Sequence, residues 1–264
     1  MKPLFALLLS LSLTTFAKSQ VDTSWNGKKC AVVLTYDDAI DVDIDNVLPA
    51  LDSFNFKGTF YIIGASPVVA KRMDAWRKAA KNGHELGNHA LFHPCDGRLP
   101  GRSFVGPDTD LSKYTVSRAV SEIRQNNTLL KAIDGKDTRT FAYPCGDLKI
   151  GDSLFYSSLH NDFSGARGVN QGLQHASEIN IDNINSYMIH DKPASYMIDL
   201  VKQAQRTGTL LVFLFHGVGG GHPLNVSLDA HSALLHYLKQ NEKDIWIATM
   251  NDVALKIRAI QNKH

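Results

Sequence analysis

The feature that most constrains the fold of this 264-residue chain is a repeated alternation of apolar, β-branched runs with stretches of helical character. The apolar runs, which we predict as strands, lie at residues 30–36, 58–63, 140–143, 210–215 and 245–249. The predicted helices lie at residues 46–54, 67–81, 116–133, 196–207, 230–239 and 253–260. Repeated strand–helix units predict an α/β fold with a parallel sheet covered by helices, either a barrel or a doubly wound sheet.

The N-terminus has the zones of a secretory signal. Lys2 precedes an apolar run at residues 4–13, and Ala17-Lys18-Ser19 supplies small residues for cleavage. This run is shorter than the roughly 20 residues that a bilayer-spanning helix needs. We therefore expect a signal peptide at residues 1–19, a single catalytic domain at 20–264, no membrane span, and a secreted or periplasmic protein.

Bulk composition excludes some classes of partner. The chain is 44% hydrophobic and 20% charged, as expected of a globular protein with a real core. Its formal net charge is only +2, and no block of Lys or Arg is present. We therefore expect neither a nucleic acid nor an anionic membrane as a partner.

Unusual polar groups follow three of the buried segments. Asp37 and Asp38 end the first strand, His89 and His93 follow residues 85–88, and His216 follows an apolar strand. In parallel α/β folds, polar groups at the carboxyl ends of strands tend to be functional. A single His is more often structural, but a His pair with one carboxylate supplies three ligands and leaves open positions for water, as catalytic metal sites require.

These segments resemble, in order and spacing, the motifs of the polysaccharide deacetylase family (NodB homology, carbohydrate esterase family 4). The four segments are Thr35–Asp38, Asn88–His93, Phe141–Gly146 and Leu214–His216. The resemblance extends over about residues 28–258 and implies a distorted (β/α) barrel with the site at the strand carboxyl ends.

The resemblance also implies a metal site. It makes Asp38, His89 and His93 the ligands of one divalent ion, most simply zinc, and it makes Asp37 the general base. Such an ion lowers the pKa of bound water toward neutrality, so that a nearby carboxylate can accept the proton.

Further residues are implied around the substrate. The backbone N–H of Cys145 would stabilise charge on the acetyl oxygen, and His216 would protonate the departing amine or alcohol. Tyr143 and Pro144 are expected beside the substrate, and Leu214 is expected at the acetyl methyl.

The sequence departs from the family pattern at two points. Ala142 stands where many members have an Arg that pairs with the base. Arg167 could enter from another loop and replace it, and Arg139 is a second candidate. The acid that tunes the catalytic His is not evident, and the possible partners of His216 are Asp147, Asp182 and Asp252.

The remaining candidates have simpler interpretations. We expect His84 to make a structural hydrogen bond, and the glycines at residues 217–221 to form a flexible rim beside His216. Four further histidines are expected at the surface: His222, His231, His236 and His264.

Three cysteines leave at least one unpaired. Cys30 begins an apolar run and is expected to be buried, whereas Cys95 and Cys145 each lie next to the predicted site. We predict that Cys95 and Cys145 are neighbours, and an exported protein permits a disulfide between them.

The leading hypothesis is therefore hydrolysis of an N-acetyl or O-acetyl group on a polysaccharide or oligosaccharide. One alternative is a metal-dependent amidase acting on a small amide that is not a sugar. Another is a module that binds metal and carbohydrate without turnover, which the absence of an Arg at Ala142 motivates.

Overall fold

A computed structural model describes residues 25–262. The predicted signal at residues 1–19 and the predicted surface residue His264 therefore lie outside the described residues. Within 25–262, no helix has the length and apolar character needed to cross a bilayer.

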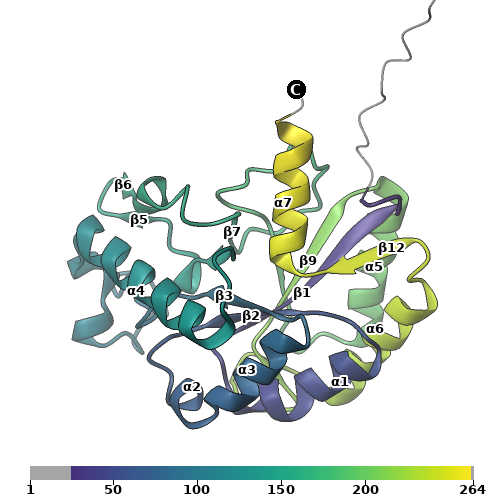
Figure 1. The fold of residues 1–264 in the computed structure, drawn as a ribbon, viewed down its shortest axis with the longest axis horizontal. Coiled ribbons are helices and arrows are strands. Elements are labelled where there is room, and N and C mark those ends of the chain that lie inside the picture. Colours follow the sequence, from purple (N-terminus) through teal and green to yellow (C-terminus); the bar gives the residue numbers. More distant parts are fainter. Residues whose placement is uncertain (1–24, 263–264) are drawn as a thin grey trace, which may run out of the picture.

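The centre of the molecule is one eight-stranded parallel sheet (Figure 1). Its strands are β1 (Cys30–Asp37), β2 (Thr59–Ile62), β3 (Glu85–Asn88), β4 (Phe141–Ala142), β7 (Ala166–Arg167), β8 (Tyr187–Met188), β9 (Leu210–Phe215) and β12 (Ile245–Ala248). The order is β7-β4-β3-β2-β1-β9-β8, and β12 pairs with the first half of β1. Two short pairs lie outside this sheet: β5 (Lys149–Ile150) with β6 (Ser153–Leu154), and β10 (Gly217–Val218) with β11 (Asn225–Val226).

Residues 184–188 link the two edges of the sheet. Ile184 forms a parallel bridge with Arg167 of β7, and β8 then pairs with β9 three residues later. The sheet therefore curves round on itself, and the predicted distorted (β/α) barrel is confirmed.

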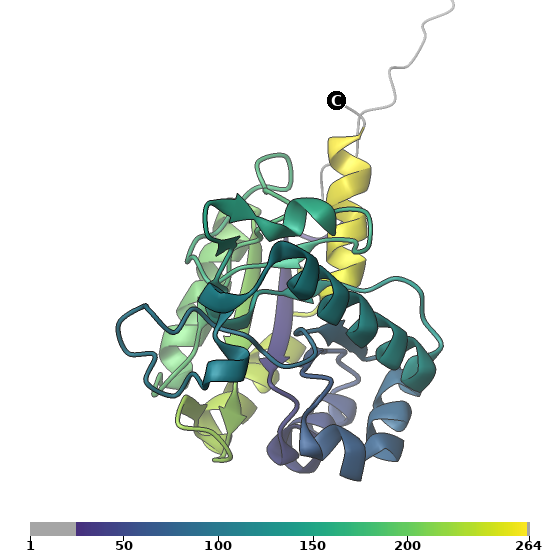
Figure 2. The same ribbon diagram turned by 90° about the vertical axis from the view of Figure 1, so that its left-hand side faces the viewer.

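Helices pack against both faces of the sheet (Figures 1 and 2). They are α1 (Leu48–Ser53), α2 (Pro67–Lys71), α3 (Met73–Lys81), α4 (Val116–Asp134), α5 (Ala194–Thr207), α6 (Leu228–Gln240) and α7 (Met250–Gln261). A π-helical turn at Asp43–Val47 precedes α1, and short 3-10 turns lie at Pro107–Thr109, Leu111–Lys113, Pro144–Gly146 and Phe155–Ser158. The predicted helix at 67–81 is two helices, because the backbone at Arg72 leaves the helical region.

Local chemistry explains where the helices end. Thr115, Ser227 and Thr249 cap the first turns of α4, α6 and α7 with their side-chain oxygens. Gly135 and Gly208 end α4 and α5 at φ values of 72° and 70°, which glycine adopts without steric cost.

Strand β1 is buried on both faces, which explains its nearly continuous apolar sequence. Cys30, Val32, Leu34 and Tyr36 belong to one core cluster, whereas Ala31 and Val33 belong to a second cluster with residues of α7. Because side chains alternate along a strand, Asp37 lies on the same face as Ala31 and Val33. That alternation directs the last side chain of β1 toward the interior of the barrel.

Candidate metal centre

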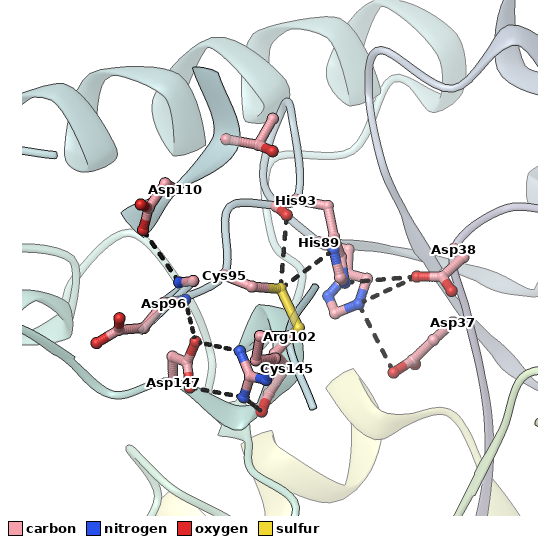
Figure 3. The surroundings of a disulfide bond; sticks show 12 residues. Asp37, Asp38, His89, His93, Cys95, Asp96, Arg102, Asp110, Cys145 and Asp147 are labelled. Atoms are coloured by element: carbon pink, nitrogen blue, oxygen red, sulfur yellow. Dashed lines mark hydrogen bonds and ion pairs between the residues drawn. A yellow bond between two sulfur atoms is a disulfide. The ribbon is translucent and has the colours of Figure 1, made fainter. Parts of the chain in front are cut away.

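Asp38, His89 and His93 converge on one point at the carboxyl end of the sheet (Figure 3). Asp38 follows β1 and His89 follows β3, and His93 lies in the turn beyond it. Asp38 Oδ1 is 3.6 Å from the Nε2 atoms of both histidines. One potential ligand atom from each residue lies within 4.8 Å of the other two.

The backbone around these residues adopts an unusual conformation. Asp38, Ala39, Ala90, His93 and Cys145 all have positive φ values, between 52° and 81°. Non-glycine residues adopt such values at a cost of roughly 1–3 kcal/mol each, and surrounding structure must hold them. The site therefore concentrates backbone strain where the strands turn outward.

The ring of His89 is oriented by a hydrogen bond on the side away from Asp38. Its Nδ1 lies 2.9 Å from the carbonyl oxygen of Ala142. Because a carbonyl only accepts, Nδ1 carries the proton and Nε2 presents a lone pair toward Asp38. A backbone partner at the second ring nitrogen is the usual arrangement for a metal-binding imidazole.

Burial keeps both imidazoles neutral, as metal ligation requires. Desolvation lowers the pKa of His89 to about 3 and that of His93 to about 4, although the nearby charge of Asp37 acts in the opposite direction. The pKa of Asp38 is raised, first by burial and then by the charge of Asp37. Two neutral imidazoles therefore face a carboxylate whose ion-pair contacts within the described residues are all with histidines.

The residues fit a divalent ion. Asp38 Oδ1 is buried and has no hydrogen-bond partner within residues 25–262, although it points between the two histidine nitrogens. Tetrahedral ligand bonds of about 2.0–2.1 Å place neighbouring ligand atoms roughly 3.3–3.5 Å apart, close to the spacing observed here. Two histidines with one carboxylate are a ligand set found in catalytic zinc sites.

Asp37 is paired with Arg167 beneath this centre. Arg167 Nη2 lies 2.6 Å from Asp37 Oδ2, and the two side chains are only 0% and 4% exposed. Burial raises the pKa of Asp37. The combined opposite effect of Arg167, His89 and His216 is larger, so the net pKa lies below its usual value. The structure thus brings a cation from β7 to the acid.

Arg139, the other candidate for this role, lies elsewhere. Its guanidinium binds both carboxylate oxygens of Asp134, at 3.0 and 3.2 Å, and the carbonyl oxygens of Leu86 and Lys136. The suggestion that Arg139 pairs with Asp37 is therefore wrong.

His216 follows β9 and is partly buried. Its Nδ1 is buried and makes no hydrogen bond to the part of the chain that the structure describes. The three acids suggested as partners bind other groups: Asp147 binds Arg102, Asp182 binds His160, and Asp252 binds Thr249.

His222 occupies a place that the sequence did not predict. Its ring stacks on that of His216, with centroids 4.7 Å apart and planes 13° apart. Its Nε2 lies 3.7 Å from Asp38 Oδ2, and its side chain is only 27% exposed. The interpretation of His222 as a surface residue is therefore wrong.

The other histidines differ in their surroundings. His231 is buried and hydrogen-bonded to the Tyr36 hydroxyl at 2.8 Å, so its assignment to the surface is also wrong. His236 is exposed, as predicted. His84 makes the predicted structural hydrogen bonds, accepting from Gly58 N and contacting Asp52 Oδ1.

The Cys95–Cys145 disulfide is confirmed, with the Cα atoms 5.8 Å apart. Cys95 Sγ also lies 3.6 Å from His93 Nδ1, so the bridge contacts a predicted ligand (Figure 3). Arg102, which the sequence did not indicate, donates to Cys145 O and to both oxygens of Asp147. The loop at 94–113 is thereby tied to the turn that carries Cys145.

The residues predicted near the substrate are largely enclosed. Tyr143 is buried and donates its hydroxyl to Asp182 O at 2.7 Å, and Pro144 is buried beside it. Leu214 is 1% exposed in β9. The hydrogen bonds of the Pro144–Gly146 turn come from Gly146 N and Asp147 N, so Cys145 N–H is not used in them.

A family model described as polysaccharide deacetylase matches residues 25–156. The chain is 28% identical over 106 residues to the uncharacterized protein YlxY of Bacillus subtilis, covering 40% of this chain and 28% of that protein. It is 21% identical over 218 residues to the bifunctional xylanase/deacetylase of Pseudobutyrivibrio xylanivorans, covering 78% and 33%. It is 35% identical over 71 residues to the peptidoglycan-N-acetylglucosamine deacetylase of Bacillus cereus, covering 25% and 24%. The chain thus spans at most about a third of the length of these relatives.

Solved structures share the fold. A Pseudomonas aeruginosa PAO1 protein assigned to the polysaccharide deacetylases superposes with a TM-score of 0.63 at 10% identity, covering 95% of this chain and 98% of that one. A Mycobacterium smegmatis protein with the same assignment gives 0.61 at 16% identity, covering 88% and 91%. The Bc1960 peptidoglycan N-acetylglucosamine deacetylase gives 0.55 at 19% identity, covering 86% and 88%.

Proposed function

Because this chain belongs to the polysaccharide deacetylase family, a family of carbohydrate deacetylases, we propose that it hydrolyses acetyl groups on a polysaccharide or oligosaccharide with one divalent ion, most simply zinc. The observation that carries this proposal is the convergence of Asp38, His89 and His93 beside a separate acid, Asp37. Three protein ligands with an open position for water are typical of catalytic metal sites, and a neighbouring carboxylate can accept the proton of that water.

The ion would be held by Asp38 Oδ1 and by the Nε2 atoms of His89 and His93. When bound, it would supply Lewis acidity and lower the pKa of bound water from about 15.7 toward 7. Asp37 is the group that accepts the proton. Its pairing with Arg167 keeps this carboxylate ionised and fixes it on the inner face of β1.

The remaining chain groups act on the acetyl group and the leaving group. The N–H of Cys145, in a turn with φ of 55°, would donate to the acetyl oxygen as negative charge develops on it. His216 would return a proton to the departing amine or alcohol. Tyr143 and Pro144 would lie beside the substrate, and Leu214 would line the pocket for the acetyl methyl.

The class of substrate is an acetylated glycan. One relative is a peptidoglycan-N-acetylglucosamine deacetylase and another a bifunctional xylanase/deacetylase, and the proposal includes both N-acetyl and O-acetyl groups. The signal-like residues 1–19 favour a secreted or periplasmic location, where such polymers occur.

A module that binds carbohydrate without turnover is the weaker proposal. Its motivation was the absence of an Arg at Ala142, but Arg167 lies 2.6 Å from Asp37 and supplies the cation by another route. No feature within residues 25–262 favours an amidase acting on a small amide.

The test is an acetate-release screen over N- and O-acetylated glycans, using apo protein with and without added zinc. We expect zinc-dependent acetate release from at least one glycan. Asp37→Asn should lower kcat by roughly 10²–10⁴-fold while zinc still binds. Asp38→Ala should lose the zinc.

Two outcomes would contradict the proposal. One is glycan binding by the zinc-loaded protein with no acetate released from any acetylated substrate. The other is equal loss of zinc in Asp37→Asn and Asp38→Ala, which would show that the roles of the two acids are wrongly assigned.

A further inference from the structure

We propose that His222 is a positioning residue of the metal centre. Its Nε2 atom restrains Oδ2 of Asp38, and its ring fixes the ring plane of His216. This inference rests on the proposed function for its chemical meaning. Its geometric basis is independent: His222 Nε2 lies 3.7 Å from Asp38 Oδ2, and its ring stacks on His216.

The tautomer of His222 follows from its hydrogen bonding. Leu224 N donates to His222 Nδ1 at 3.0 Å. A backbone N–H can donate only to a ring nitrogen that carries no proton, so in this neutral ring the proton is on Nε2. The N–H group of His222 is therefore the group that faces Asp38 Oδ2.

His222 and His89 thus present opposite chemistry to the same carboxylate. His89 has its proton on Nδ1, bound to Ala142 O, and offers a lone pair at Nε2. His222 offers a proton at Nε2, so it can stabilise Asp38 but is not oriented to bind an ion. Their targets also differ, because His89 faces Oδ1 and His222 faces Oδ2.

The different contacts of the two Asp38 oxygens have a consequence for metal binding. A donor near Oδ2 restrains rotation of the Asp38 side chain and leaves Oδ1 directed at His89 and His93. Such outer partners orient ligands, and their loss typically weakens metal affinity about 10–100-fold. The 3.7 Å separation is longer than a hydrogen bond, so the contact is electrostatic as it stands.

The loop that carries His222 is built to hold it there. Gly219, Gly220 and Gly221 have φ values of 74°, 115° and 79°, a run that other residues adopt only with strain. Gly217 N donates to Leu224 O, Gly219 N to Val226 O, and Gly220 N to Asn225 Oδ1. The glycines permit the turn, and the hydrogen bonds fix its shape.

His222 also replaces a missing support for His216. The Nδ1 atom of His216 has no hydrogen-bond partner in residues 25–262, so no hydrogen bond at this atom fixes the orientation of the ring. The parallel stack with His222 restricts the ring plane instead. One side chain therefore couples the proposed metal ligand to the proposed acid.

The test compares His222→Phe with His222→Gln in apo protein titrated with zinc against a chromophoric chelator. We expect His222→Phe, which keeps a flat ring but loses the N–H, to bind one zinc about 10-fold more weakly. His222→Gln, which restores an N–H donor, should recover most of that affinity. His175→Phe, at an exposed position outside the site, is the control and should bind zinc as the wild type does.

Each remaining outcome overturns the assignment. Wild-type affinity in His222→Phe would show that the contact with Asp38 has no effect on the ion. Complete loss of stoichiometric zinc would make His222 a ligand rather than a positioning residue. If the wild type binds zinc and releases acetate but His222→Phe is unaffected, only this inference fails. A wild type that binds no zinc removes the proposed function as well.

A KM-against-kcat comparison adds a readout that a purely structural role would not affect. In zinc-saturated protein, His222→Gln keeps the donor to Asp38 but loses the flat ring that stacks on His216. We expect its kcat to fall while KM stays unchanged. A changed KM with wild-type kcat would contradict the coupling to His216.

Discussion

The two sides of the metal centre are built in different ways. The His89–His93 arm, residues 88–95, is fixed by buried side chains and a disulfide. Asn126 of α4 donates to Ile62 O, Asn88 Oδ1 and Ala90 O, each at 3.0 Å, and Cys95 is bonded to Cys145. The His216–His222 arm, residues 216–226, is instead fixed mainly by glycine conformations and backbone hydrogen bonds.

This difference indicates which part of the site is coupled to the stability of the fold. Two ligands on the first arm must keep a spacing suited to one ion, and a covalent bond with a buried polar network restricts them. The second arm carries His216 and His222, which the proposal assigns to proton transfer and positioning. We expect substitutions in the first arm to affect folding and metal binding together, and those in the second to lower turnover as well as the zinc affinity that His222 supports.

The largest effect is expected from a residue that belongs to neither arm. Arg167→Met removes the buried partner of Asp37 and should destabilise the fold by about 3–5 kcal/mol, as removal of one member of a buried ion pair does. It should also lower kcat roughly 100-fold. Without its cation the pKa of Asp37 rises, so the acid limb of the pH–rate profile should move to higher pH.

Arg139→Met is the matched control for this prediction. Arg139 and Asp134 form a second buried pair, with side chains 2% and 1% exposed. We expect a comparable loss of unfolding free energy in denaturant titration, with kcat and the acid limb of the surviving folded protein unchanged. A shifted acid limb in both variants would show that the effect of Arg167 is not specific to Asp37.

The sequence predicted the first arm far better than the second. Asp37 and Asp38 were found because they end a predicted apolar strand, and the roles of these two acids and of His89 and His93 were implied by the resemblance to the family motifs. The pairing of Cys95 with Cys145 followed from their places next to the site. Asp, His and Cys residues that lie together in buried positions have few other roles, so their residue types indicated this part of the site.

The role of His222 was missed for a physical reason. It lies at no strand end, and its approach to Asp38 depends on three consecutive positive φ values that a run of glycines permits but does not dictate. Arg167 was preferred to Arg139 as the partner of Asp37, but β7, which carries it, is only two residues long and has no periodic signal from which its place in the sheet could be predicted. Sequence patterns predict elements well and irregular loop geometry poorly.

The second prediction tests the first arm by removing its disulfide. Replacing both Cys95 and Cys145 with Ser opens a covalent link across 50 residues and should cost roughly 2–4 kcal/mol of unfolding free energy. Because Cys95 is two residues from His93 and contacts its ring, zinc affinity should fall as well.

Cys30→Ala serves as the control for this change. Cys30 is buried at the start of β1, away from the strand end that carries the site, so its loss should affect stability without weakening zinc binding. Zinc affinity that stays at the wild-type value in the double Ser variant would show that the polar network holds His93 without the disulfide.

The smallest effect is expected in the second arm. Gly221→Ala places a side chain at φ of 79°, where its Cβ would meet Val42 Cγ2 at 2.8 Å. The cost should be about 1–3 kcal/mol. Because His222 is the next residue, the strain should displace its ring and lower both kcat and zinc affinity. Gly151→Ala is the matched control, since Gly151 has a φ of 57° and open space around the added atom. It carries the same kind of backbone strain without the clash, so thermal denaturation should show a smaller loss and turnover should be unchanged. Equal effects of the two substitutions on turnover would mean that the shape of the glycine loop does not position His222.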